Sequence, residues 1–180
     1  IMGKFDYVSN MGFKNFKNPL GRKQFFKPGG PICKVFANSW NTVIRIGKYM
    51  FMHGGMSLPI SKKYNIIQIN SYMRSFLNGN IKIFYTNLFK NLFVLPNSLL
   101  WNRQFSNNNP NCKLAKEVLH NQNASFMVLG HTPQERGINL KCGSIWCIDT
   151  GMSEAFGKRI NNNRIQILEI VRNGKNVKIK

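Results

Sequence analysis

The sequence predicts an α/β domain, because short apolar segments alternate with longer segments whose apolar residues recur at helical spacing. The clearest strand is residues 125–129, whose apolar run is typical of a strand buried on both faces. Residues 48–52 form a second run of this kind. Between them, residues 61–93 carry apolar side chains near helical period. We therefore expect an open α/β sheet with its functional groups beyond the strand ends.

Each of these two strands is followed by a histidine. Residues 130–133, Gly-His-Thr-Pro, cannot continue a strand, so His131 lies at a strand end. His53 follows the earlier strand in the same way and precedes two glycines. Functional groups of open α/β sheets gather at the carboxyl ends of the strands, so we expect His53 and His131 to converge on one site. Either histidine alone is as readily an ordinary loop or core residue.

The remaining elements follow in chain order. Glycine and proline predict a loop over residues 13–31, with Phe16, Phe25 and Phe26 anchoring it onto a core. Pro31 suits the first turn of a helix. The other expected elements are a helix over 31–40, a strand at 42–46, two helices within 61–93 broken at 78–80, a helix over 112–119 with His120 as its C-terminal cap, a strand at 144–148, and a final hairpin of 165–171 and 177–180 turning at 173–174.

Composition limits the domain organisation and the compartment. With 180 residues, 43% of them hydrophobic, the chain can bury one domain-sized core and needs no disulfide bond or structural metal ion for stability. The sequence contains no apolar stretch long enough to cross a bilayer and no signal-peptide pattern, so we expect a cytoplasmic location and no membrane partner. The cysteines follow no Cys-x-x-Cys spacing and are predicted to be free thiols in a reducing compartment: Cys33, Cys112, Cys142 and Cys147.

The charge balance has two opposite implications. The net charge of +20, from 26 Lys and Arg against 6 Asp and Glu, would attract nucleic acid or phosphorylated substrates. The basic residues are scattered singly, however, and form no arm. The aspartates are only Asp6 and Asp149, whereas a two-metal hydrolytic centre needs carboxylate oxygens besides histidines. The chain is therefore short of ligands for such a centre.

Four motifs in sequence order resemble the calcineurin-like metallophosphoesterases. They are residues 51–56 (Phe-Met-His-Gly-Gly-Met), 100–103 (Leu-Trp-Asn-Arg), 128–134 (Val-Leu-Gly-His-Thr-Pro-Gln) and 146–153 (Trp-Cys-Ile-Asp-Thr-Gly-Met-Ser). Gly21-Arg22 and Pro28-Gly29-Gly30, which precede the first motif, look most like the Shewanella-like (bacterial-type) protein phosphatase branch. Each motif alone is weak evidence for the resemblance, but four motifs in the right order are strong evidence. The resemblance covers nearly the whole chain.

The resemblance implies two packed β-sheets flanked by helices, with a two-metal centre on loops at strand ends. It implies that His53 and His131 bind the second metal. Imidazole ligands imply divalent transition metals such as Mn, Fe or Zn. Arg103 resembles a phosphate-contacting arginine, although a surface arginine beside a buried Trp101 is an equal interpretation. Asp149, which could suggest a metal ligand, is more consistent with a structural role in the wall of the site.

The chain departs from the family at its N-terminus. The motifs Gly-Asp-x-His-Gly, Gly-Asp-x-x-Asp-Arg-Gly and Gly-Asn-His-Glu, which supply the other ligands, are absent from the sequence, and residues 1–8 resemble the segment that lies just after the last of these motifs in the family. We therefore expect a fold incomplete at its N-terminus, with residues 1–180 as the C-terminal part of one metallophosphatase domain.

The complete protein is then expected to hydrolyse phosphate monoesters of phosphoproteins or small molecules, and this chain alone to be inactive. Two alternatives remain. One is a degenerate, non-catalytic phosphatase-like scaffold that binds phosphoproteins. The other is a basic nucleic-acid-binding module, which the net charge suggests but which explains neither the two histidines nor the order of the motifs.

Overall fold

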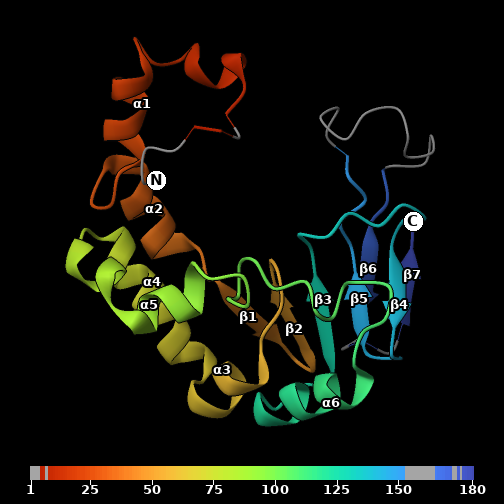
Figure 1. Cartoon of the computed structure of the whole chain (residues 1–180). Helices are drawn as coiled ribbons and strands as arrows, with labels where there is room; N and C mark the ends of the chain where they lie inside the picture. The colour runs from red at the N-terminus through yellow and green to blue at the C-terminus, as the bar shows by residue number, and fades with distance from the viewer. Residues whose placement is uncertain (1–4, 7, 153–164, 172–173, 175) are drawn as a thin grey trace. The chain divides into compact units, whose positions relative to one another are not determined.

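The structure is a computed structural model that describes residues 5–6, 8–152, 165–171, 174 and 176–180 (Figure 1). The chain forms two compact units. The first unit comprises residues 1–41 and 67–90, and the second comprises residues 42–66 and 91–180. The predicted assignment of all 180 residues to one domain stays a prediction.

The second unit is built on a five-stranded mixed sheet with strand order β1-β2-β3-β5-β4. Strands β2, β3 and β5 run parallel, and β1 and β4 pair antiparallel at the two edges. The central side chains Met50, Met127 and Leu129 are almost fully buried, as the apolar runs predict. The strands are β1 (Val43–Ile46), β2 (Tyr49–Met52), β3 (Phe126–Leu129), β4 (Asn139–Lys141) and β5 (Ile145–Cys147).

Two helices of the second unit are joined at their C-terminal ends. Helix α3 (Leu58–Lys63) and helix α6 (Cys112–Asn121) lie side by side in Figure 1. The buried amide of Gln122, directly after α6, donates to the carbonyls of Ser61 and Tyr64 at 2.8 and 2.9 Å. These bonds satisfy carbonyls that the end of a helix leaves without partners.

A two-stranded antiparallel sheet, β6 (Leu168–Val171) and β7 (Asn176–Ile179), completes the second unit. Gly174, between these strands, lies so close to the Tyr49 ring of β2 that a Cβ would not fit. The Ile138 amide donates to Gln166 Oε1 at 2.7 Å. The predicted α/β class with two sheets and flanking helices is confirmed. Asn173 of the predicted turn lies outside the described residues.

The first unit is helical. Its elements are η1 (Asn10–Phe13), α1 (Pro19–Phe26), α2 (Pro31–Ser39), α4 (Ile66–Leu77, which begins in the second unit), η2 (Ile81–Tyr85) and the first part of α5 (Asn87–Phe93). The predicted start of a helix at Pro31 and the break at residues 78–80 are confirmed. The break holds Gly79, which lies against Gly29, and the Gly29 amide donates to the Leu77 carbonyl at 2.8 Å.

The predicted loop over residues 13–31 was wrong, because residues 19–26 form helix α1. Asn18 caps this helix by accepting a hydrogen bond from the Gly21 amide at 2.9 Å, and Pro19 occupies its first turn. The predicted anchoring of three phenylalanines onto a core is also corrected. Their rings pack on one another, with the Arg22 guanidinium 4.4 Å from the centre of the Phe26 ring, and none of the side chains of α1 is buried.

Candidate functional site

His53 and His131 meet at the carboxyl edge of the main sheet. Strands β2 and β3 are parallel with Met52 opposite Leu129, so the residues that follow them leave the sheet together. The Gly130 amide donates to the His53 carbonyl at 3.0 Å, which continues the pairing by one residue. The two imidazoles consequently lie side by side, with His53 Nε2 3.0 Å from His131 Nδ1. The predicted convergence of the two histidines is present.

Backbone geometry at both histidines favours this arrangement. His131 has φ of 63°, a left-handed conformation that turns the chain sharply after Gly130. On the other strand, Gly54 donates from its amide to the Leu99 carbonyl at 3.0 Å. A Cβ on Gly54 would lie 2.9 Å from that oxygen and 3.0 Å from the Asn102 carbonyl oxygen. Gly54 therefore allows the 99–102 segment to pass directly against the strand end.

That close approach brings Arg103 to the histidines. Arg103 Nη1 donates to the His131 carbonyl at 2.8 Å and to Thr132 Oγ1 at 3.3 Å. Trp101, 47% exposed, lies with its indole nearly perpendicular to the His131 ring, with the ring centres 5.5 Å apart. Asn102, between Trp101 and Arg103 in the sequence, is buried, and its Oδ1 accepts a hydrogen bond from the Gln104 backbone amide at 2.8 Å. The buried residue of this segment is therefore Asn102, and the sequence-based expectation of a buried Trp101 is corrected.

The electrostatic environment keeps both histidines neutral at physiological pH. Burial lowers the pKa of His53, and the Arg103 guanidinium adds to this effect against the opposing Asp149 carboxylate. Burial also lowers the pKa of His131, with further lowering by Arg103 and His53 and opposition from the Trp101 backbone and Asp149. A neutral imidazole has a free lone pair on one ring nitrogen, which is the form that binds metals.

The donor set fits a metal ion in part. Two imidazole nitrogens 3.0 Å apart can share one transition-metal ion at the usual nitrogen–metal distance of about 2.1 Å. Nowhere in the described part of the chain do three or more His, Cys, Asp or Glu side chains gather to hold an ion. His53 and His131 therefore offer two of the ligands that such an ion needs.

Asp149 and His120 take up other positions. The Asp149 carboxylate accepts a hydrogen bond from the Gly151 backbone amide at 3.0 Å. The backbone carbonyl of Asp149 accepts a second one from the Gln134 backbone amide at 2.7 Å. It thus shapes the turn after β5. His120 is exposed in the last turn of α6, and Gln122, two residues further on, is the capping residue. That contradicts the cap predicted at His120.

A polar network beside the site was not predicted. Thr132 Oγ1 lies 2.7 Å from Ser106 Oγ, and the buried Gln134 amide donates to the Ser106 carbonyl at 3.2 Å. Lys141 of β4 donates from Nζ to the carbonyls of Ser106 and Asn107 at 3.1 and 2.7 Å. The proline after Thr132 signals the turn, but no spacing in the sequence relates this turn to residue 106 or 141.

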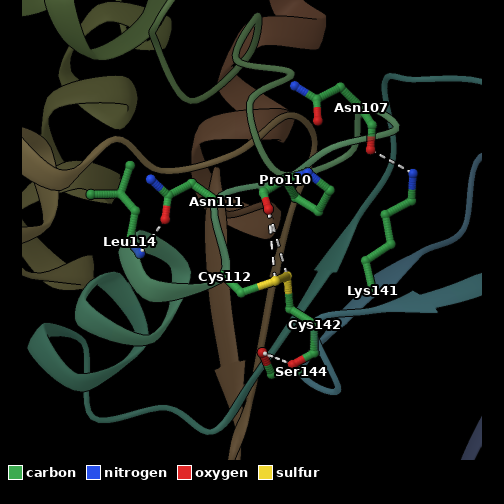
Figure 2. Close-up of a disulfide and its surroundings, with 8 residues drawn as sticks. All are labelled: Asn107, Pro110, Asn111, Cys112, Leu114, Lys141, Cys142 and Ser144. Atoms are coloured by element: carbon green, nitrogen blue, oxygen red, sulfur yellow. Dashed lines mark hydrogen bonds between the residues drawn. A yellow bond between two sulfur atoms is a disulfide. The ribbon is translucent and has the colours of Figure 1, made fainter.

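The prediction of four free thiols was wrong for two of them. Cys112, the first residue of α6, forms a disulfide with Cys142, directly after β4 (Figure 2). Their Cα atoms are 5.3 Å apart, within the range that a disulfide spans. Cys33 and Cys147 are free, as predicted, and both are buried. Thirty residues separate the bonded pair, so only the folding of β3, β4 and β5 brings the two sulfurs together.

Proteins similar to this chain include phosphatases. An uncharacterized protein of Acanthamoeba polyphaga mimivirus is 28% identical over 207 residues, which cover 93% of this chain and 82% of that protein. Shewanella-like protein phosphatase 2 of Arabidopsis thaliana is 31% identical over 150 residues, which cover 77% of this chain and 36% of that protein. No protein-family model matches the chain.

The fold is also that of a solved phosphatase. A crystal structure of the cold-active protein-tyrosine phosphatase of a psychrophilic Shewanella species superimposes with a TM-score of 0.58 and 24% sequence identity. The match covers 78% of this chain and 43% of that protein. The chain thus spans less than half the length of both named phosphatases. The chain is therefore similar in sequence to a Shewanella-like protein phosphatase and similar in fold to a protein-tyrosine phosphatase.

Proposed function

We propose that the full-length protein is a metal-dependent phosphatase of the calcineurin-like type that hydrolyses phosphate monoesters of phosphoproteins. The observation that carries this proposal is the convergence of His53, His131 and Arg103 at one edge of the sheet. Two neutral imidazoles and one guanidinium are a chemically apt set for a metal ion and a phosphate. The kinship with phosphatases supports the same reaction.

In this proposal His53 Nε2 and His131 Nδ1 hold one divalent transition metal, such as Mn, Fe or Zn. A two-metal centre of this kind supplies a water nucleophile at neutral pH and stabilises charge on the phosphoryl oxygens. The described residues provide two of its ligands. Turnover therefore requires additional ligands, which is the reason to expect this chain alone to be inactive.

Arg103 is proposed to bind and orient the phosphate. Both of its hydrogen bonds start from Nη1, so the guanidinium is fixed in position while Nη2 and Nε bond to no described residue. A guanidinium held in this way can bind a phosphate through two parallel hydrogen bonds. Its positive charge also lowers the pKa of His131, which helps to keep that imidazole neutral.

The test is hydrolysis of p-nitrophenyl phosphate and of phosphoserine and phosphotyrosine peptides by the full-length protein with and without Mn²⁺. We expect Mn²⁺-dependent turnover that His131→Ala lowers by about 100-fold or more, because a ligand is lost. The matched control, His120→Ala, removes an exposed histidine on α6 and should retain full activity. Failure of every substrate and metal combination would overturn the proposal.

A degenerate scaffold is the second candidate, favoured by the shortage of metal ligands in the described residues. It would bind phosphopeptides through Arg103 without hydrolysing them. Phosphopeptide binding that persists in His131→Ala, is lost in Arg103→Gln and is accompanied by no turnover would identify the scaffold. The nucleic-acid-binding module is not favoured, because net charge accounts for neither histidine.

A further inference from the structure

A polar cleft lies next to the histidine pair in the second unit. It has a volume of about 670 Å³, and its lining includes Ser106, Asn107, Thr132, Gln134, Arg136 and Lys141. This volume is in the range of ligand-binding pockets. Thr132 directly follows His131 and accepts a hydrogen bond from Arg103, so it belongs both to the cleft and to the surroundings of the candidate site. We call this feature the Gln134 cleft.

The floor of the Gln134 cleft is held by internal hydrogen bonds. Gln134 is 8% exposed, and its amide group donates to the carbonyls of Ser106 and Thr132 and accepts from Asn139. Lys141 holds the Ser106–Asn107 backbone through two further hydrogen bonds. Cys142, the residue after Lys141, forms the disulfide with Cys112, which is the residue where the segment from Asn107 enters α6 (Figure 2). The cleft is therefore a preformed site.

The guanidinium of Arg136 is a strong hydrogen-bond donor in the cleft that has no bonding partner among the described residues. Arg136 is exposed and forms no ion pair or hydrogen bond with any described residue, although Glu135 precedes it. Lys141, the other cation of the lining, has its ammonium group bonded to neutral carbonyls, so its charge is not cancelled. Two cations against one carboxylate give the lining a positive balance, which complements an acidic side chain.

We infer that the Gln134 cleft binds the polypeptide on one side of the phosphorylated residue and that Arg136 selects an acidic side chain there. This inference rests on the proposed function, because the peptide is the substrate of the neighbouring site. With the phosphate at Arg103, the peptide passes Thr132 into the cleft. The exposed side-chain amides of Asn107 and Asn108 in the lining suit the backbone of a peptide, and the guanidinium of Arg136 suits a carboxylate.

The test compares phosphopeptides with Asp, Asn or Lys at successive positions flanking the phosphorylated residue, using the full-length protein and kcat/KM. An Asp peptide should exceed its Asn counterpart at one position. Arg136→Gln should remove that advantage, roughly a tenfold loss, while hydrolysis of p-nitrophenyl phosphate stays unchanged. Arg136→Glu should invert the preference in favour of Lys, which a merely structural role would not do.

Glu135→Gln is the matched control, since it alters the adjacent exposed residue and removes the opposite charge. It should keep or raise the preference for Asp. Hydrolysis with equal kcat/KM for Asp and Asn peptides at every position, or an unchanged preference in Arg136→Gln, would overturn the inference and leave the phosphatase proposal standing.

If no substrate is hydrolysed, the phosphatase proposal fails by itself. The inference about the cleft is then tested by measuring the binding of the same peptides, carrying a fluorescent label, by fluorescence anisotropy. The peptides stay intact because they are not hydrolysed. Asp-dependent binding that Arg136→Gln weakens roughly tenfold supports the inference, and binding indifferent to Asp overturns it.

Discussion

Neighbouring glycines after His53 differ in their surroundings. A Cβ on Gly54 would meet three backbone atoms of residues 99–102 at 2.9–3.1 Å, whereas the nearest atoms to one on Gly55 are at 3.6 Å. We expect Gly54→Ala to lower the free energy of unfolding by about 1–3 kcal/mol, because backbone must move to admit the methyl group. Gly55→Ala should change it by less than about 0.5 kcal/mol. Urea denaturation of both variants is the measurement, and equal stabilities would contradict the crowding described at Gly54.

The buried thiol of Cys147 offers a second test at this scale. Burial raises the pKa of Cys147 to about 11, against a smaller lowering by Lys141. Between the ordinary thiol pKa of about 9 and this value, the unfolded state loses its proton and the folded state keeps it. The contribution of the Cys147 thiol to the free energy of unfolding is therefore fully present below pH 9 and is lost as the pH rises towards 11.

Alkylation measures the same shift directly. In Cys33→Ser, which keeps the hydrogen bond to the Phe26 carbonyl, Cys147 is the one remaining free thiol of the chain. At pH 8, iodoacetamide should label the native variant roughly 100-fold more slowly than the urea-unfolded variant, because the thiolate fraction falls with the rise in pKa. Equal rates would show that Cys147 is accessible and unshifted.

Among the elements, the disulfide joins the start of α6 to the end of β4 across 30 residues. Closing a loop of this length should stabilise the fold by about 3–4 kcal/mol, mainly by restricting the unfolded chain. The double variant Cys112→Ser, Cys142→Ser should lose this amount in urea denaturation, and dithiothreitol should have no further effect on it. Four reactive thiols in the unreduced, unfolded wild-type protein, rather than two, would contradict the bond.

Elements with long periodic patterns could be predicted from the sequence, and elements set by spatial contacts could not. The runs ending at His53 and His131 revealed β2, β3 and their common edge, because buried parallel strands are continuously apolar. Strand β4 has three residues and none of them buried, so it leaves no apolar pattern. Helix α1 was missed because Pro19 and Gly21, which lie in its first turn, were interpreted as loop residues.

For the candidate site, the sequence predicted the three residues that lie within motifs: His53, Arg103 and His131. The Thr132–Ser106–Gln134 network was missed because backbone carbonyls accept most of its bonds, and any residue type supplies a carbonyl. The disulfide was missed for a related reason: cysteine spacing along the chain carries no information on the distance between Cα atoms in the fold.

The whole molecule carries a net charge of +20. Within the ranges described, the salt bridge present is Lys180–Glu169, and it is exposed. Mutual repulsion of like charges destabilises a compact chain, and salt screens it over about 8 Å at physiological ionic strength. We expect the melting temperature to rise as NaCl increases from roughly 0.05 to 0.5 M. KCl serves as the control for specific ion effects, and a falling melting temperature would contradict the repulsion.

The described residues include no helix with the length and apolar character needed to cross a membrane.

Because the sulfurs of Cys112 and Cys142 are bonded, residues 112–142 form a covalent ring that contains β3, His131 and the exposed Arg136. A single tryptic cut after Arg136 would open this ring without releasing either piece, since each piece keeps one of the two cysteines. Such a nicked protein would migrate as one chain on a non-reducing gel and as two on a reducing gel. His53 and His131 would both remain on the N-terminal piece, and the disulfide would keep that piece joined to the one that carries β4 and β5.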